Sequence, residues 1–144
     1  MVHLDVLYWL PGWKASDKTS FRARVVDAIA GEGWVVDGSF SGLAFDLTLA
    51  RSDTLIVIDR PRLLCQWRIA CRSAFDRDEM RPDLPKGCAE QFDWNLMREA
   101  WRYNAERRPA IEAERLKHGA KVPVVRLSRD REIEEYLNAS SPVN

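Results

Sequence analysis

The stretch DTLIVIDRPRLLCQWRIACR, residues 53–72, joins an apolar run to an amphipathic one. Residues 54–58 carry apolar and β-branched side chains without alternation, which predicts a strand covered on both faces, as in a parallel sheet. Asp59 ends this strand, and Pro61 fits the first turn of a helix that we expect to reach about residue 75. A strand followed at once by a helix is the repeating unit of parallel α/β folds.

Strand and helix alternate on both sides of this stretch. Residues 17–30 carry an apolar stripe at i, i+4 and i+8, which predicts a helix with the core side chains Phe21, Val25 and Ile29. Further predicted elements are strands at 34–37 and 122–127 and helices at 43–51, from 94 to about 119 with a break near Pro109, and after the N-cap residue Ser128. This order predicts one α/β domain over residues 1–144, with a parallel sheet flanked by helices on both faces.

The composition is that of a globular protein without a strong overall charge. Of 144 residues, 46% are hydrophobic and 31% are charged, and 22 basic residues balance 22 acidic ones. Zero net charge provides no general attraction to nucleic acid or to an anionic membrane, so an anion site must be built locally. Because no apolar run could span a membrane and the N-terminus does not resemble a signal peptide, we expect a cytoplasmic protein.

The cysteines and most of the tryptophans are interpreted as packing residues. The cysteine count is odd and no C-x-x-C pair occurs, which favours a reducing compartment, with Cys65 and Cys71 expected in the core. Core-like spacings predict buried side chains for Trp34, Trp67, Trp94 and Trp101. No zinc spacing and no Ser–His or Cys–His arrangement is present in the sequence.

Carboxylates follow three of the predicted strands. Asp5 follows the apolar start of the chain, Asp37 ends the strand at 34–37, and Asp59 ends the next strand. The carboxyl ends of parallel strands share one rim, where such folds bind ligands, and carboxylates suit a Mg²⁺ ion that also touches phosphate. An aspartate can equally end a strand as a turn former, and this alternative stays open for each of the three.

Arginines cluster in residues 60–81. Arg68 and Arg72 lie at i, i+4 and share one helix face, where both could hold one anion through bidentate contacts that lysine cannot make. Arg107 and Arg108 could converge on the same anion from the returning helix. For five other arginines we expect solvated helix faces: Arg22, Arg24, Arg115, Arg129 and Arg131.

Trp9 and Trp13 flank Pro11–Gly12 in a stretch without clear periodicity. An aromatic loop at the rim could stack on a planar substrate ring. The same residues could simply pack within the fold, and the sequence alone does not separate the two interpretations.

Five segments resemble, in order, the small P-loop kinases of the adenylate-kinase-like group that are described as DNA topology modulation proteins. They are HLDVLYWLPGW (3–13), GWVVDGSFSG (33–42), DTLIVIDRPRLLCQWRIACR (53–72), RPDLPKGCAEQFDW (81–94) and VVRLSRDREIEEYL (124–137). The first two are the most specific, and together the five cover nearly the whole chain. The resemblance implies phosphoryl transfer from ATP, with Mg²⁺, to a nucleotide or another small acceptor, and a lid at about residues 76–93.

The resemblance also implies roles for individual residues. The catalytic arginines would be Arg68, Arg72, Arg81 and Arg108, or Arg107 in place of Arg108. Asp37 would support Mg²⁺ through a water molecule, and the adenine ring would lie near Leu127, Ser128 and Arg129. The acceptor side would include Asp5, Trp9 and Gly38.

One part of the family pattern is missing. Members begin with a strand, a G-x-x-x-x-G-K-[ST] loop that grips the phosphates, and a helix, and this motif occurs nowhere in the sequence. We therefore expect a chain that starts at the second strand of the family, through a misassigned start, and that is inactive as it stands. The alternative is a non-catalytic nucleotide-binding or regulatory module. A direct action on duplex DNA is disfavoured by the zero net charge.

Overall fold

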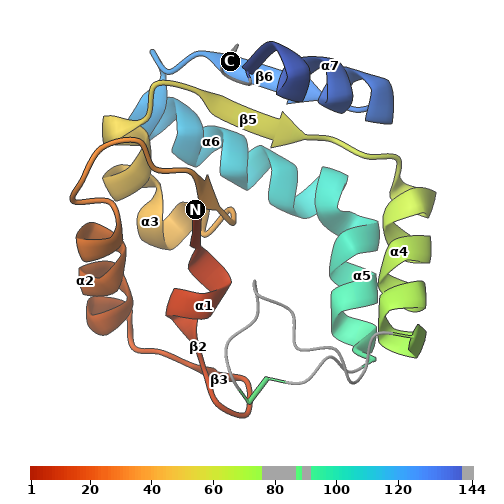
Figure 1. Ribbon diagram of the computed structural model, residues 1–144. Helices are drawn as coiled ribbons and strands as arrows, with labels where there is room; N and C mark the ends of the chain where they lie inside the picture. The colour runs from red at the N-terminus through yellow and green to blue at the C-terminus, as the bar shows by residue number, and fades with distance from the viewer. Residues whose placement is uncertain (76–86, 89–91, 141–144) are drawn as a thin grey trace.

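The computed structural model describes residues 1–75, 87–88 and 92–140, so most of the predicted lid lies outside the described residues. The elements in chain order are β1 (Val2–His3), α1 (Leu4–Tyr8), β2 (Trp9–Leu10), β3 (Lys14–Ala15), α2 (Lys18–Ala28), β4 (Val36–Asp37), α3 (Ser41–Thr48), the 3₁₀ turn η1 (Leu49–Arg51), β5 (Leu55–Ile58), α4 (Arg62–Phe75), α5 (Trp94–Arg102), the π-helical segment η2 (Tyr103–Arg107), α6 (Arg108–Gly119), β6 (Val124–Leu127) and α7 (Asp130–Ser140) (Figure 1).

The described strands pair in three separate two-stranded sheets. β1 lies parallel to β4, with His3 opposite Asp37, and β5 lies parallel to β6, with Leu55 opposite Val124. β2 and β3 form a short antiparallel hairpin that the sequence did not predict. The α/β class with parallel pairing is therefore confirmed, whereas the expected continuous parallel sheet is divided into two pairs within the described residues.

The main core forms where α2 packs against α1 and α3. Leu4, Phe21, Val25, Ile29 and Ala44 are each at most 2% exposed, and they form one cluster. Three of these residues are the stripe predicted for residues 17–30, so that prediction is confirmed. Burial of such side chains, at roughly 25 cal/mol per Å² of apolar surface, is the main term that holds the N-terminal part together.

Several apolar residues expected inside lie at the surface. Ile56 and Ile58 of β5 are 43% and 60% exposed, so the prediction of a strand covered on both faces is wrong for the described structure. The prediction of buried tryptophans is also wrong for Trp67, Trp94 and Trp101, which are exposed on α4 and α5, two helices that lie side by side (Figure 1). Periodicity identifies a stripe but does not reveal whether another element covers it.

The long helical region after residue 94 follows the prediction in outline. Its expected break near Pro109 is a π-helical segment, η2, and Pro109 lies in the first turn of α6. Proline lacks the N–H that an interior helical hydrogen bond needs, so the α-helical pattern changes just before it. α6 then runs along β5 (Figure 1) and reaches the turn η1 that follows α3, where Gly119 packs against Leu49.

Three arginines assigned to solvated helix faces are structural instead. Arg22 grips both oxygens of Asp46 at 2.8 and 2.6 Å and so joins α2 to α3. Arg24 donates to the Leu7 carbonyl oxygen at 3.0 Å. Arg115 binds Glu112 in the same two-pronged way, at 2.9 and 2.8 Å.

The cysteines also differ from the expectation. Cys65 and Cys71 are half-buried, whereas Cys88 is buried, and its thiol donates to the Leu10 carbonyl oxygen at 3.3 Å. Over the described ranges, no helix has both the length and the apolar character needed to cross a membrane.

Candidate functional site

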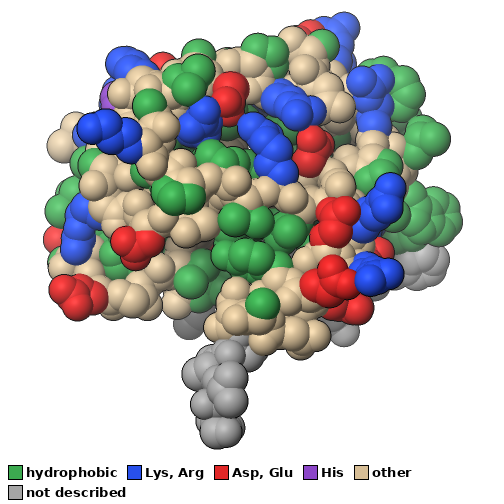
Figure 2. Space-filling view, turned by 90° about the horizontal axis from the view of Figure 1, so that it is seen from above, with side chains coloured by type: hydrophobic (Ala, Val, Ile, Leu, Met, Phe, Trp, Pro, Cys, Tyr) green, Lys and Arg blue, Asp and Glu red, His purple; other side chains and the backbone are tan. Residues whose placement is uncertain are grey.

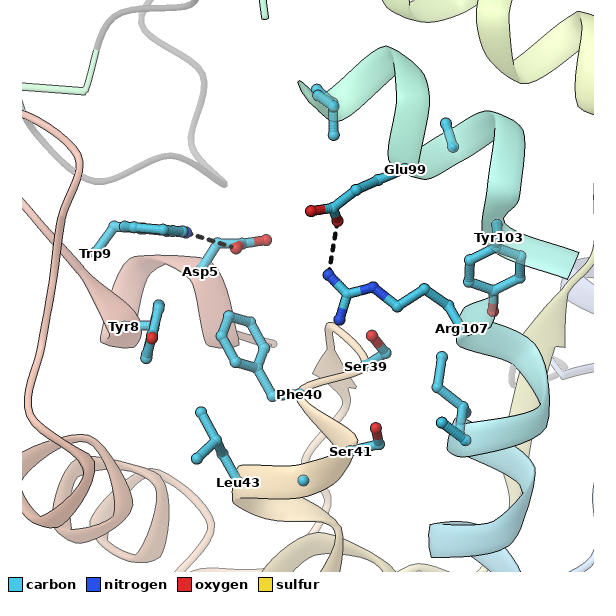
Figure 3. Close-up of a pocket in the computed structure, with 15 residues that line it drawn as sticks. Asp5, Tyr8, Trp9, Ser39, Phe40, Ser41, Leu43, Glu99, Tyr103 and Arg107 are labelled. Carbon is cyan, nitrogen blue, oxygen red and sulfur yellow. Dashed lines mark hydrogen bonds and ion pairs between the residues drawn. The ribbon is translucent and has the colours of Figure 1, made fainter. Parts of the chain in front are cut away.

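A cavity of about 760 Å³ opens between the N-terminal part of the chain and the α5–η2–α6 helices (Figure 3). One wall comes from α1, the β4–α3 connection and the start of α3, and the other from α5, η2 and α6. The volume lies in the range usual for small-molecule sites. Because β1 leads into α1 and β4 leads into Ser39, the cavity is at the carboxyl ends of this parallel pair, where α/β folds bind ligands.

The β4–α3 connection reaches the cavity because of Gly38. Its φ is +118°, a conformation that favours glycine, and a Cβ at this position would lie 3.1 Å from Leu4 Cβ. The chain therefore turns closely over α1 and brings Ser39, Phe40 and Ser41 to the cavity. The sequence prediction placed Gly38 on the acceptor side; Gly38 does not itself line the cavity but directly precedes the lining residue Ser39.

Aromatic rings form the N-terminal wall. The centroid of the Tyr8 ring lies 4.9 Å from the centroids of both the Trp9 and Phe40 rings. The indole N–H of Trp9 donates to Asp5 Oδ1 at 3.2 Å, so the aromatic wall also orients a carboxylate that lines the cavity (Figure 3). Trp9 lines the cavity and also packs edge to face against Tyr8 and Trp13, so both interpretations of this residue stay open.

The opposite wall carries a charged pair. Arg107 extends from η2 toward Ser39 in Figure 3, and its guanidinium meets Glu99 Oε2 at 2.6 Å. Tyr103 lies one helical turn earlier on the same wall. Asp5, Glu99 and Arg107 are the charged residues among the described residues that line the cavity.

The other predicted arginines do not line this cavity. Arg68 is exposed on α4 and lies 3.9 Å from Asp130, and Arg108 pairs with Asp59 at 3.1 Å. Arg72 lies one turn after Arg68 on α4 and is half-buried. Arg81 lies outside the described residues. Asp5, Trp9 and Arg107 thus line one cavity, whereas Arg68 and Arg108 lie near the carboxylates of Asp130 and Asp59 elsewhere.

The predicted adenine loop is a tightly held turn. Leu127 is buried at the end of β6, and Arg60 donates to the Ser128 carbonyl oxygen at 3.1 Å while pairing with Asp130 at 2.7 Å. The Glu132 carboxylate accepts the N–H groups of Ser128 at 2.8 Å and Arg129 at 3.1 Å. These backbone donors lower the pKa of Glu132, and the Glu132 carboxylate caps α7 where the sequence suggested the Ser128 hydroxyl.

Asp37 was predicted to support Mg²⁺ through water. Its side chain is 58% exposed at the end of β4, and its Oδ2 lies 3.2 Å from Nδ1 of His3. Among the described residues, no three His, Cys, Asp or Glu side chains are grouped to hold a metal. A lone exposed carboxylate fits an ion that keeps most of its waters and is otherwise held by substrate phosphates.

Sequence reasoning did not single out several of the lining side chains, Ser39 among them. Tyr8, Phe40, Glu99 and Tyr103 were missed, although Tyr8 and Phe40 lie inside the two motifs that carry the resemblance. Glu99 and Tyr103 leave no mark in the sequence, because only the path of the chain after residue 94 brings them opposite Asp5.

Comparison with known proteins gives no assignment: no family model matches the chain, and no significant similarity is found to curated proteins or to solved structures.

Proposed function

We propose that this chain forms the acceptor-binding part of a P-loop kinase of the adenylate-kinase-like group, which transfers a phosphoryl group from ATP to a small molecule. The observation that carries the proposal is the cavity at the carboxyl ends of β1 and β4, which both Asp5 and Ser39 line. Ligands of α/β folds bind at this edge. The order of the motifs along the chain supports the same family.

The division of the strands also supports the proposal. β1–β4 and β5–β6 are separate pairs, and Val35, Ile56 and Ile58 expose 61%, 43% and 60% of their surface. In the family, a strand, the phosphate-binding loop and a helix belong to the same core. We propose that such a segment, which is not among these 144 residues, covers these apolar side chains.

The chemistry follows from the residues of the cavity. The hydroxyl group of the acceptor donates its proton to the Asp5 carboxylate, which Trp9 holds in place. The hydroxyl oxygen bonds to the γ-phosphorus of ATP as the bond from that phosphorus to the bridging oxygen breaks, which leaves ADP. Mg²⁺, when bound near Asp37, neutralises charge on the phosphates. Arg107 and Ser39 would orient the acceptor.

Transfer of labelled γ-phosphate tests this proposal. The 144-residue chain should have negligible activity, because positioning and charge neutralisation by the phosphate loop account for most of the catalysis in phosphoryl transfer. The chain preceded by its own upstream reading frame should reach rates of about 1–100 s⁻¹. An upstream frame without G-x-x-x-x-G-K-[ST], or an extended chain without transfer, contradicts the proposal.

The predicted anion-binding arginines of α4, Arg68 and Arg72, provide a second test of the proposal. In the extended chain, Arg72→Lys keeps the charge but loses the bidentate geometry, and it should lower turnover. Arg131, which is 87% exposed, is the control, since Arg22 and Arg115 have structural partners. Equal turnover of Arg72→Lys and Arg131→Lys would remove Arg72 from the site.

A further inference from the structure

We infer that the outer side of α4 and α5 binds anionic lipid, so that the protein attaches to the surface of a negatively charged membrane. We call this region the Trp–Arg surface. It consists of Arg62, Leu63 and Trp67 of α4 and Trp94, Arg98 and Trp101 of α5. None of these six residues lines the cavity, so the surface serves a function beyond the proposed phosphoryl transfer and does not depend on it.

Two contacts define the seam between α4 and α5, which lie side by side (Figure 1). Gln66 Nε2 donates to the Met97 carbonyl oxygen at 2.8 Å. One turn earlier on α4, the Arg62 guanidinium lies 4.8 Å from the centroid of the Trp101 ring, one turn later on α5. The two helices are therefore antiparallel.

The exposed residues beside this seam lie on one side of the helix pair. Leu63 and Trp67 each follow a seam residue of α4 by one position, and Arg98 follows a seam residue of α5. Each step along a helix turns the side chain by about 100°, and in antiparallel helices these turns lead to the same side. Trp94, Arg98 and Trp101 lie at i, i+4 and i+7, so both tryptophans share that side. The six residues therefore form one continuous surface.

Large apolar side chains dominate the Trp–Arg surface. Trp94 is 75% exposed, Leu63 73%, Trp67 68% and Trp101 49%. A group of such side chains on the outside of a protein marks an interaction site. Tryptophan is enriched where a membrane meets water, because its ring is apolar and its N–H is polar, and leucine side chains insert among acyl chains. The apolar part of the surface therefore fits a membrane interface.

The charge of the Trp–Arg surface fits an anionic lipid. Among the described residues, neither Arg62 nor Arg98 pairs with a carboxylate: Arg62 lies over the Trp101 ring, and Arg98 donates to the Asn95 side-chain oxygen at 3.0 Å. The sequence of α4 contains no acidic residue. Each arginine near an anionic membrane strengthens binding by about fivefold, because its charge is attracted to the negative headgroups.

Single-stranded nucleic acid also binds surfaces of aromatic and arginine side chains, because its bases stack on open rings. The rings of this surface are partly covered. Arg62 lies over the Trp101 ring, and the Trp94 ring meets Phe92 in a T-shaped contact with the centroids 4.9 Å apart. The exposed side chain of Leu63 is aliphatic, so it provides no ring for a base, whereas acyl chains accept it. These contacts favour lipid.

Co-sedimentation of the 144-residue chain with lipid vesicles tests the inference. Vesicles of phosphatidylcholine are compared with vesicles that contain phosphatidylcholine and phosphatidylserine in equal amounts. The chain should bind the mixed vesicles at least about fivefold more tightly, since each unpaired arginine adds about that factor. Binding should weaken as salt is added, because salt screens the attraction between the arginines and the headgroups.

Two matched pairs of variants locate the binding. Leu63→Ser should bind the mixed vesicles about tenfold more weakly, because it removes an apolar side chain that inserts into lipid, whereas Leu116→Ser, an exposed change on α6, should bind as wild type does. Arg98→Gln should bind about fivefold more weakly, whereas Arg131→Gln, an exposed change on α7, should not. Since all four side chains are exposed, the midpoints of thermal unfolding should stay near that of wild type.

Absence of binding to the mixed vesicles, or equal affinities of Leu63→Ser and Leu116→Ser, overturns the inference. Two further results would overturn it by giving the surface another occupant. A labelled oligothymidylate that binds the chain and loses affinity in Trp67→Ser, without any binding to vesicles, would assign the surface to nucleic acid. A dimer on size-exclusion chromatography that Trp67→Ser dissociates, again without vesicle binding, would assign it to a second copy of this chain. The phosphoryl-transfer assay does not depend on these results.

Discussion

At the residue scale, the sequence predicted which apolar side chains are buried better than it predicted the partners of charged side chains. The stripe Phe21, Val25 and Ile29 is buried as its helical spacing indicated, because a helix turns such positions to one side. The sequence could not identify the partner of Arg22, because Asp46 lies 24 positions away and the two side chains meet only once α2 packs on α3. Asp5 was identified because it belongs to a motif, whereas Glu99 belongs to none.

The Arg22–Asp46 pair should make the stability of the protein depend on pH. Arg22 lowers the pKa of Asp46 below its ordinary value of 3.8. A lowered folded-state pKa means that the pair stabilises the protein above the unfolded-state pKa and that this contribution is lost as pH falls through the folded-state value. Asp46→Asn should therefore cost about 1 kcal/mol near neutral pH and progressively less below about pH 4.

Urea unfolding at a series of pH values measures this effect. Asp27→Asn serves as the control, because its exposed carboxylate on α2 should leave the free energy of unfolding nearly unchanged. A difference between wild type and Asp46→Asn that stays constant from pH 7 to well below the pKa would contradict the role given to the pair.

At the element scale, most boundaries were predicted within a few residues, but the contacts between elements were not. Pro109 marked the start of α6 through its backbone preference, whereas Gly119, which was predicted to cap the helix, is its last helical residue and the C-cap is Ala120. The sequence contains no local pattern that predicts the β2–β3 hairpin or that shows which helices pack against each other. The predicted coverage of β5 failed for the same reason: an apolar strand requires a cover but does not identify it.

The approach of α6 to η1 depends on Gly119. A Cβ at this position would lie 2.9 Å from Leu49 Cβ, so Gly119→Ala should destabilise the protein by about 1–3 kcal/mol despite the better helix propensity of alanine. Gly42→Ala in α3 is the matched control, because a Cβ there meets nothing within 4 Å and should gain up to about 1 kcal/mol. Urea denaturation of both variants gives the comparison, and equal stability would show that the contact is not tight.

The β2–β3 hairpin holds the described residues Gly87 and Cys88. Gly12 N–H donates to the Gly87 carbonyl oxygen at 3.0 Å, and a Cβ on Gly87, whose φ is +81°, would lie 3.2 Å from Pro11 Cβ. Gly87→Ala should loosen this contact and expose the Cys88 thiol, which is 4% exposed. Alkylation at Cys88, followed by mass spectrometry, should become faster than in wild type.

Gly31→Ala is the control for that experiment, since a Cβ there meets nothing within 4 Å and the residue lies away from the hairpin. An unchanged alkylation rate at Cys88 in Gly87→Ala would mean that the contact with the hairpin does not protect the thiol.

At the scale of the whole molecule, the α/β class was predicted, and the division of the strands was not. Basic and acidic side chains are interspersed over the face in Figure 2, in line with the zero net charge. Composition could not show that apolar side chains of β5, α4 and α5 are exposed. The exposure of a side chain depends on which helices and strands pack against each other, and composition carries no information about that packing.

The proposed additional segment should protect β5 and the start of β4. In the chain with its upstream reading frame, the methyl groups of Ile56 and Ile58 should become shielded from a soluble paramagnetic probe, because a covering strand and helix exclude it. Val6, which is 40% exposed on α1, is the control and should stay accessible. Unchanged accessibility of both isoleucines would contradict the proposed completion of the core.

The most direct measurement of the central claim is the turnover of Asp5→Asn in the extended chain, with Asp27→Asn beside it. Asparagine keeps an oxygen that can accept the Trp9 N–H but cannot take up the acceptor proton. The account predicts that turnover falls by about 100-fold or more while the midpoint of thermal unfolding matches that of the control. Turnover within about twofold of wild type would contradict the claim that phosphoryl transfer takes place in this cavity.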